Sequence, residues 1–264
     1  MTNVAFLASI LIGLGFVATG NANAQSSSVV REFATRPSIS VKAIVTTPEK
    51  AVGQVILLPG GGGDIGLNAS GQITAPQMAD NFTVRTRSMF VAAGYTTIVL
   101  DVASDVTNLI SPTSRDSIAN NRDDVVAVAA TLKKESKLPL WVVGTSASSW
   151  RLVLMTHKLQ SEAGISGIVL TGTVVGKSEM YWKAVEQITV PVLVVHHRKD
   201  ACFYSKPEAI QPLVDALKAP VKKVVWIEDG NSQGDPCHEW AYHGFNGKEA
   251  DAVGSILSWM KSGQ

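Results

Sequence analysis

Short apolar runs alternate with helix-like segments along most of this sequence, and that alternation restricts the possible folds more than any other feature. Runs of strand length occur at 38–46, 52–58, 95–102, 138–144, 167–173, 190–196 and 221–228. Helix-like segments lie between or after them, at 81–93, 117–134, 152–159, 207–217 and 249–261. Runs that are apolar throughout are typical of strands buried in a parallel sheet. The pattern predicts an α/β fold with a mostly parallel central sheet and helices on both faces.

The first residues have the pattern of an export signal. An uncharged apolar run from Val4 to Val17 is followed by Ala22-Asn23-Ala24, which has the form of a cleavage site. Such a run has the length of a signal-peptide core and is short for a membrane span. We expect a signal peptide at 1–24, an N-terminal leader at 25–37 and one α/β domain at 38–264. An uncleaved anchor or a core helix is the alternative, because Met1–Asn3 carries no Lys or Arg.

The charge balance excludes several classes of partner. The chain has 23 Lys and Arg against 22 Asp and Glu, a formal net charge of +1. A protein that holds nucleic acid or an anionic membrane needs a basic surface, and this balance provides none. We therefore expect an exported protein, periplasmic or extracellular, with no nucleic-acid partner and no stable membrane anchor after cleavage. Its oligomeric state stays open.

The chain has two cysteines, Cys202 and Cys237. An even number of cysteines in an exported protein indicates a disulfide. Two free buried thiols are the alternative.

One strand runs directly into a helix-like segment through the sequence Gly144-Thr145-Ser146-Ala147-Ser148. A sharp strand-to-helix turn lifts its central serine above the carboxyl edge of a sheet, and it needs small residues two positions before and after that serine. Here Gly144 holds the first position and Ser148 the second, where glycine is usual. The pattern indicates a nucleophile at Ser146; a serine that only caps the helix is the alternative.

Two further residues could complete a catalytic triad with Ser146. Asp200 ends a short loop after the strand at 190–196, and His243 precedes the last helix. The resulting order Ser, Asp, His is that of α/β hydrolases. His238 is the alternative base. A disulfide between the two cysteines would join the loop of the acid to the loop of the base.

Four glycines, Gly60 to Gly63, follow the strand at 52–58. Backbone N–H groups of such a loop can approach a reacting carbonyl closely. We expect Gly61 N–H and Ala147 N–H to form an oxyanion hole, with Gly62 as the alternative to Gly61. The spacing Gly61-x-Gly63-x-x-Gly66 also matches a dinucleotide-binding pattern, but no helix-like segment follows it.

His196, His197, His238 and Asp200 could suggest a metal site. No metal-ligand spacing recurs among them, so an ordinary polar loop cluster is the favoured interpretation.

Together the four motifs resemble the α/β-hydrolase superfamily, in outline its dienelactone-hydrolase-like members and other small exported esterases. The resemblance covers residues 38–262, and its departures are Ser148 for glycine and Pro59 where many members have histidine. It implies a serine hydrolase that cleaves a small-molecule ester through an acyl-enzyme on Ser146. His243 would act as the base and Asp200 would orient it, with no metal or organic cofactor.

The 17 residues from 174 to 190, between two predicted strands, leave no room for a large lid. We therefore expect little or no cap domain and an open site. Two alternatives remain: an inactive binding protein on the same fold, and a thioesterase, acyltransferase or peptidase with the same triad.

Overall fold

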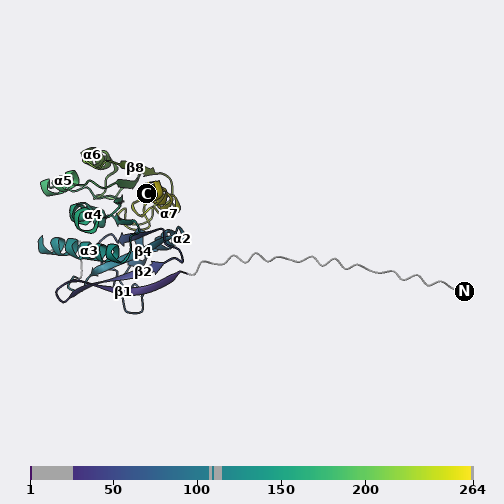
Figure 1. Ribbon diagram of the computed structural model, residues 1–264. Coiled ribbons are helices and arrows are strands. Elements are labelled where there is room, and N and C mark those ends of the chain that lie inside the picture. The colour runs from purple at the N-terminus through teal and green to yellow at the C-terminus, as the bar shows by residue number, and fades with distance from the viewer. Residues whose placement is uncertain (2–25, 107–108, 110–114, 263–264) are drawn as a thin grey trace.

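The computed structural model describes Met1 and residues 26–106, 109 and 115–262, and its centre is one eight-stranded sheet (Figure 1). The strand order is β1-β2-β4-β3-β5-β6-β7-β8. The strands are β1 (Ser27–Arg36), β2 (Ile39–Thr47), β3 (Gly53–Leu58), β4 (Tyr95–Ala103), β5 (Leu140–Thr145), β6 (Gly167–Thr171), β7 (Val192–His197) and β8 (Lys222–Ile227). Strands β3 to β8 pair in parallel with one another, whereas β2 pairs antiparallel with both β1 and β4 at one edge of the sheet. The predicted signal peptide lies outside the described residues, apart from Met1.

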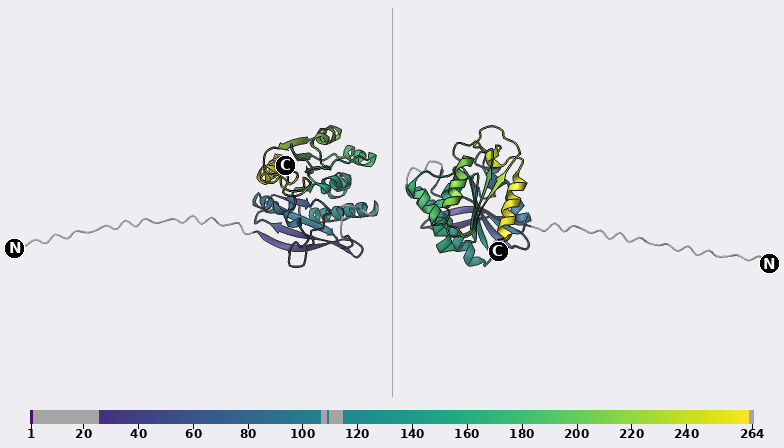
Figure 2. Two further views of the ribbon diagram at one scale, coloured as in Figure 1. Left: turned by 180° about the vertical axis from the view of Figure 1, so that it is seen from behind. Right: turned by 90° about the horizontal axis from the view of Figure 1, so that it is seen from above.

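Helices cover both faces of the sheet (Figure 2). One face carries α3 (Arg115–Glu135), α4 (Ala147–Lys158), α5 (Glu179–Glu186) and α6 (Ile210–Ala216). The other carries α1 (Phe82–Arg85), α2 (Arg87–Ala92) and α7 (Glu249–Ser262). Short helical turns lie at η1 (Met78–Asp80), η2 (Leu159–Ala163), η3 (Pro207–Ala209) and η4 (Tyr242–Gly244). The predicted mostly parallel α/β architecture is confirmed.

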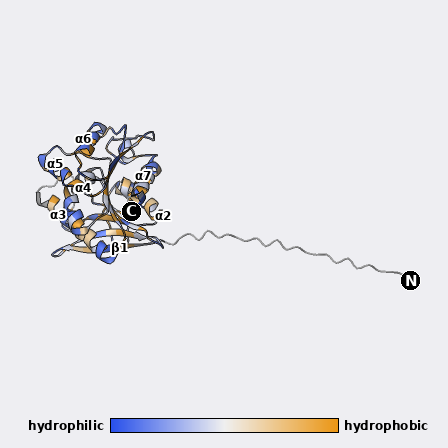
Figure 3. Ribbon diagram, turned by 45° about the horizontal axis from the view of Figure 1, so that its top comes forward, coloured by the Kyte–Doolittle hydropathy of each residue, from blue (hydrophilic) through white to orange (hydrophobic). Residues whose placement is uncertain are grey.

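Alternate side chains of the strands enter two separate cores. On β3, Ile56 packs with the core under α3 to α6, while Val55 and Leu57 pack with the core under α1, α2 and α7. Successive side chains of a strand point to opposite faces, so a strand buried on both sides must be apolar at every position. Figure 3 shows these hydrophobic stretches inside the molecule and hydrophilic residues on the outer faces of the helices.

The predicted leader at 25–37 is wrong for residues 27–36, which form strand β1. This strand pairs with β2, for example Val30 with Ile44. Only Phe33 of its side chains is fully buried, so β1 has a weak apolar pattern in the sequence. The strand is instead stabilised by its backbone pairing with β2. The strand predicted first, at 38–46, is therefore the second strand of the sheet.

The helix predicted at 81–93 is divided into α1 and α2 at Thr86. The Thr86 hydroxyl donates a hydrogen bond of 2.6 Å to the carbonyl of Phe82. Such back-bonding by a threonine competes with regular helix geometry and often bends a helix.

The connections around β3 position the site. Strand β3 lies between β4 and β5. The chain leaves β3 towards α1 and α2, on one face, whereas it leaves β5 into α4, on the other. Where connections diverge in this way, a crevice opens at the carboxyl ends of the strands, and ligands of open α/β sheets bind there.

The connection from β6 to β7 contains α5, and no separate cap domain covers Ser146 in the part of the chain that is described. Among the same residues, none of the helices is long and apolar enough to cross a lipid bilayer. No helix begins at Gly66, where the dinucleotide pattern would need one; the chain instead makes a β-bridge between Leu67 and Ile73.

Candidate active site

Ser146 is the single residue between the end of β5 and the start of α4. Its φ of 53° and ψ of −126° lie in a region that residues with a side chain rarely adopt. Such strained backbone persists where the surrounding structure holds it, often at functional sites. A Cβ added to Gly144 would lie 2.8 Å from the carbonyl oxygen of Ser148, so the turn needs glycine there. The predicted strand-turn-helix is present.

The structure brings Ser146, Asp200 and His243 into one hydrogen-bonded chain. His243 Nδ1 lies 2.8 Å from Asp200 Oδ2, and His243 Nε2 lies 2.8 Å from Ser146 Oγ. Because a carboxylate only accepts, Nδ1 carries the proton and Nε2 accepts from the serine hydroxyl. His238 is exposed and makes no contact with Asp200 among the described hydrogen bonds, so the geometry favours His243 as the base.

Asp200 is held as an anion by several donors. Its Oδ1 accepts from the Cys202 N–H at 2.9 Å, and its Oδ2 accepts from the Ser205 hydroxyl at 2.8 Å. Burial works to raise the pKa of Asp200, but the hydrogen bond and charge interaction with His243 and the other donors outweigh it. The pKa of this carboxyl therefore stays below its ordinary value, which keeps it ionised beside the imidazole.

Ser205 is a member of this network that the sequence did not identify. Its hydroxyl lies 2.9 Å from His243 Nδ1 as well as 2.8 Å from Asp200 Oδ2, and the residue is 1% exposed. It lies in the loop after Asp200. A serine in a polar loop has no distinguishing pattern, so only the folded structure could reveal it.

His196 and His197 are structural in this arrangement. His196 Nδ1 accepts from the Thr173 N–H at 3.1 Å, so Nε2 donates to the Ser205 carbonyl at 3.0 Å. Burial lowers the pKa of His196 to about 4, so the ring is neutral near pH 7. His197 likewise bonds backbone groups through both ring nitrogens. The described residues contain no cluster of three or more His, Cys, Asp or Glu suited to a metal ion.

Cys202 and Cys237 form the predicted disulfide. Cys202 follows Asp200 by two residues and its N–H bonds the Asp200 carboxylate, while Cys237 lines the pocket beside Ser146. The bond therefore ties the loop of the acid to the loop that leads to His243.

Reduction of this disulfide is expected to lower the melting temperature. The bond joins residues 35 apart. In the chain-entropy model a loop of this length stabilises the fold by about 4 kcal/mol, which corresponds to a fall of about 8–16 °C. The check is a thermal melt with and without dithiothreitol, with the double variant Cys202→Ser/Cys237→Ser as a control whose melt should not respond. An unchanged wild-type melt together with two titratable thiols would contradict the prediction.

Two N–H groups of the glycine loop have no hydrogen-bond acceptor in the part of the chain that the structure describes. Gly60 N–H donates to Asn81 Oδ1 at 3.3 Å, and Gly63 N–H donates to the Gly60 carbonyl at 3.1 Å. For Gly61 and Gly62, no acceptor occurs among the described residues. Both line the pocket that contains the serine, so each of the two candidates considered from the sequence remains a possible oxyanion donor.

The second predicted donor, Ala147, is the first residue of α4. The first N–H groups of a helix have no partner within it and carry the positive end of the helix dipole. A Cβ added to Gly60 would lie 3.1 Å from Ser146 Cβ, so the glycine loop passes directly beside the serine and the start of α4.

Ser148, the residue in place of the usual glycine, connects the two loops. Its hydroxyl donates to the carbonyl of Pro59 and accepts from Arg151 Nη2 at 2.7 Å. The hydroxyl thereby fastens the start of α4 to the glycine loop. The two departures from the superfamily pattern are thus joined by a hydrogen bond from the Ser148 hydroxyl to the Pro59 backbone carbonyl.

Comparisons with solved structures place this geometry in a known fold. A dienelactone hydrolase from Anabaena variabilis aligns with a TM-score of 0.60 and 13% identity, over 90% of this chain and 96% of that one. An α/β serine hydrolase without a lid from Xanthomonas campestris gives 0.58 and 14%, over 87% and 95%. A monoglyceride lipase variant from Saccharomyces cerevisiae gives 0.64 and 11%, over 92% and 98%. The chain has the α/β-hydrolase fold. No protein-family model and no curated protein sequence matches it.

In this α/β-hydrolase fold a pocket of about 620 Å³ opens at Ser146. Its apolar wall combines aliphatic and aromatic side chains from several loops and helices: Pro76, Met78, Phe82, Leu109, Trp150, Val174 and Tyr204. The volume suits a small organic molecule, and the wall suits an apolar group next to a few polar contacts.

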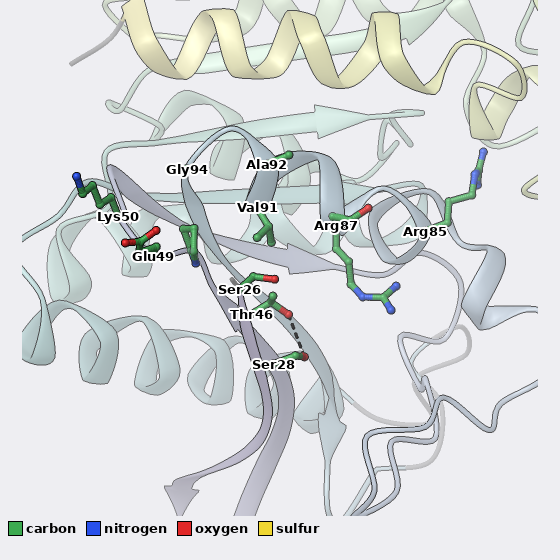
Figure 4. A pocket seen from close by; sticks show the side chains of 12 residues that line it. Ser26, Ser28, Thr46, Glu49, Lys50, Arg85, Arg87, Val91, Ala92 and Gly94 are labelled. Carbon is green, nitrogen blue, oxygen red and sulfur yellow. Dashed lines mark hydrogen bonds between the residues drawn. The ribbon is translucent and has the colours of Figure 1, made fainter. Parts of the chain in front are cut away.

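A second hollow, of about 800 Å³, lies between the hairpin of β1 and β2 and helix α2. Figure 4 shows Glu49 and Lys50 at one end and Arg85 and Arg87 at the other. None of its lining residues belongs to the hydrogen-bonded chain of Ser146. This hollow is larger than the pocket at Ser146. The smaller pocket is nevertheless the candidate active site, because both Ser146 and His243 line it.

Proposed function

We propose that this protein is a serine hydrolase that cleaves small carboxylic esters through an acyl-enzyme on Ser146. The observation that carries the proposal is the continuous chain of hydrogen bonds from Asp200 through His243 to the Ser146 hydroxyl. This is the arrangement that activates a serine for attack on a carbonyl carbon.

In the acylation step, His243 Nε2 takes the proton of Ser146 as Oγ attacks the ester carbon. Asp200 keeps the imidazole in the required tautomer and stabilises the imidazolium that forms. The same imidazolium then gives its proton to the leaving alcohol. Water, activated by His243, hydrolyses the acyl-enzyme and regenerates the free serine.

The negative charge on the tetrahedral intermediate would lie against the N–H groups of Ala147 and Gly61, or Gly62 in place of Gly61. These donors have no competing acceptor among the described residues, and they lie beside the serine. Donors that are already oriented towards developing charge stabilise the transition state without reorganisation.

An ester is the favoured substrate because the pocket is apolar and of modest size. The names of the structural neighbours, which include a dienelactone hydrolase, an esterase domain from a Rhodothermus marinus protein and a monoglyceride lipase, agree with this choice. The signal-like residues 1–24 and the disulfide support export to an oxidising compartment.

A fluorophosphonate probe tests the proposal. Wild-type protein should be labelled at Ser146, and Ser146→Ala should not be labelled. The matched control is Ser161→Ala, which removes an exposed hydroxyl in η2, directly after α4, and should label normally. Labelling of the Ser146→Ala variant would mean that another residue is the nucleophile. Absence of labelling in the wild type would instead favour a binding protein on the same fold.

Product analysis separates esterase activity from related chemistry. Release of p-nitrophenol from short acyl esters, with faster turnover than for matched thioesters or amides, is the expected result. A preference for thioesters or amides, or transfer of the acyl group to an added alcohol, would make the enzyme a thioesterase, a peptidase or an acyltransferase with the same triad.

A further inference from the structure

Arg151 is a buried cation that faces only neutral groups. The residue is 4% exposed. Its guanidinium donates to the carbonyl of Gly61 at 3.0 Å, to the hydroxyl of Ser148 at 2.7 Å and to the carbonyl of Leu109 at 3.4 Å. No carboxylate pairs with it in the part of the chain that is described. Burial accordingly lowers the pKa of Arg151 to about 10, so it is still charged near pH 7.

Two other arginines in partly buried positions are neutralised by carboxylates. Arg36 pairs with Asp124 at 2.8 Å, and Arg85 pairs with Glu249 at 2.9 Å. Removing a charge from water without a counter-charge costs several kcal/mol, and an apolar side chain of similar length would avoid that cost. The unpaired charge of Arg151 therefore needs an explanation other than stability.

Two of its three hydrogen bonds connect it to the glycine loop. Arg151 reaches the Gly61 carbonyl directly, and it reaches the Pro59 carbonyl through the hydroxyl of Ser148. In a trans peptide the C=O and the following N–H point in opposite directions. Because the Gly61 carbonyl is fixed towards Arg151, the N–H of the same peptide, which belongs to Gly62, is fixed in the opposite direction. Charge-assisted hydrogen bonds to a carbonyl also polarise that peptide and strengthen its N–H as a donor.

We propose that Arg151 is a positioning residue whose unneutralised charge holds the oxyanion loop in its active form and favours the negative charge of the tetrahedral intermediate. The inference rests on the proposed function of Ser146. The side chain lines the same pocket as Ser146 and both free glycine N–H groups. In the resting enzyme no carboxylate among the described residues balances it, and during the reaction the oxyanion on the substrate supplies a negative charge.

Because the oxyanion forms only during the reaction, we expect the charge of Arg151 to affect turnover rather than substrate affinity. The neutral ester carries no charge for Arg151 to attract, whereas the intermediate carries a full negative charge in a site of low dielectric constant. An interaction that strengthens only in the transition state raises kcat without changing KM.

The experiment compares Arg151→Met with Arg151→Lys on a short p-nitrophenyl ester. Arg151→Met should lower kcat by about 10- to 100-fold with little change in KM, because it removes charge and hydrogen bonds together. Arg151→Lys, which keeps the charge, should recover part of the loss. Arg87→Met is the matched control, because Arg87 also donates to a backbone carbonyl but lies in the other hollow; it should leave kcat unchanged.

Inhibitor affinity separates charge stabilisation from a structural role. An alkyl boronic acid forms a tetrahedral anion on the serine, whereas the alcohol product binds as a neutral molecule. Arg151→Met should weaken the boronic acid by the same factor as kcat and leave the alcohol unchanged. Equal weakening of both inhibitors, a rise in KM at constant kcat, or a kcat within about twofold of wild type would overturn the inference.

Two outcomes stay distinguishable. A wild type that neither reacts with the fluorophosphonate nor hydrolyses esters would contradict the proposed function itself. A wild type that does both, while Arg151→Met retains its activity, would contradict only the role of Arg151. If Arg151→Met does not fold, as judged by its thermal melt, Arg151→Lys and Arg151→Gln repeat the comparison; equal kcat and equal boronic-acid affinity in these two variants would also overturn the inference.

Discussion

Replacement of His243 by alanine is expected to lower kcat by at least about 10³-fold, with KM nearly unchanged. In the proposed mechanism the imidazole, whose Nε2 lies 2.8 Å from Ser146 Oγ, is the base that takes the serine proton and also the acid that protonates the leaving alcohol. Without it, the serine must lose its proton to water. The measurement is steady-state hydrolysis of a short p-nitrophenyl ester, with the thermal melt of the variant as a check on folding.

The control for this prediction is His238→Ala. His238 lines the same pocket and lies in the same loop region, but it is exposed and unconnected to the described triad contacts. Its variant should turn over at close to the wild-type rate. If His243→Ala kept a normal kcat and His238→Ala lost activity, His238 rather than His243 would be the base.

Asp200→Asn is expected to lower kcat by about 10³- to 10⁴-fold while preserving the fold. Asparagine has nearly the same shape, but its amide cannot supply the negative charge that stabilises the imidazolium. Its NH₂ group can also favour the wrong tautomer of His243, with the proton on the nitrogen that faces Ser146.

Asp229→Asn is the matched control for this change. Asp229 follows β8 and has a φ of 60°, a conformation that asparagine adopts as readily as aspartate. Its backbone carbonyl, which the substitution leaves in place, accepts from His197. The control should keep wild-type kcat. If Asp200→Asn retained most of its activity, another group, with Ser205 the nearest hydroxyl to His243 Nδ1, would have to orient the imidazole.

Much of the fold could be predicted because buried parallel strands must be apolar at every position, and such runs are visible in one dimension. The runs at 52–58 and 190–196 correspond to β3 and β7. Strand β1 was missed because its side chains are mostly exposed and its stability comes from pairing with β2. The division of the helix at Thr86 depends on a hydrogen bond from one hydroxyl to a backbone carbonyl, which the spacing of apolar residues does not reveal.

The sequence by itself determined the residue types and their chain order. Ser146 stands in a strand-to-helix turn, Asp200 follows a late strand and His243 precedes the last helix. These features are local, since each depends on a strand end or a turn that neighbouring residues specify. The resemblance to α/β hydrolases follows from them, whereas the pairing of the two cysteines was predicted from their even number in a chain with an export-like start.

The tertiary structure alone decided which groups surround that site. It placed Ser205 between acid and base, occupied both ring nitrogens of His196, and bonded Ser148 to Pro59 and Arg151. These contacts join residues from different loops, and hydrogen bonds over a few ångströms depend on orientation as well as proximity. The alternation of strands and helices therefore predicted where a site would open, whereas packing between loops decided which polar atoms meet in it.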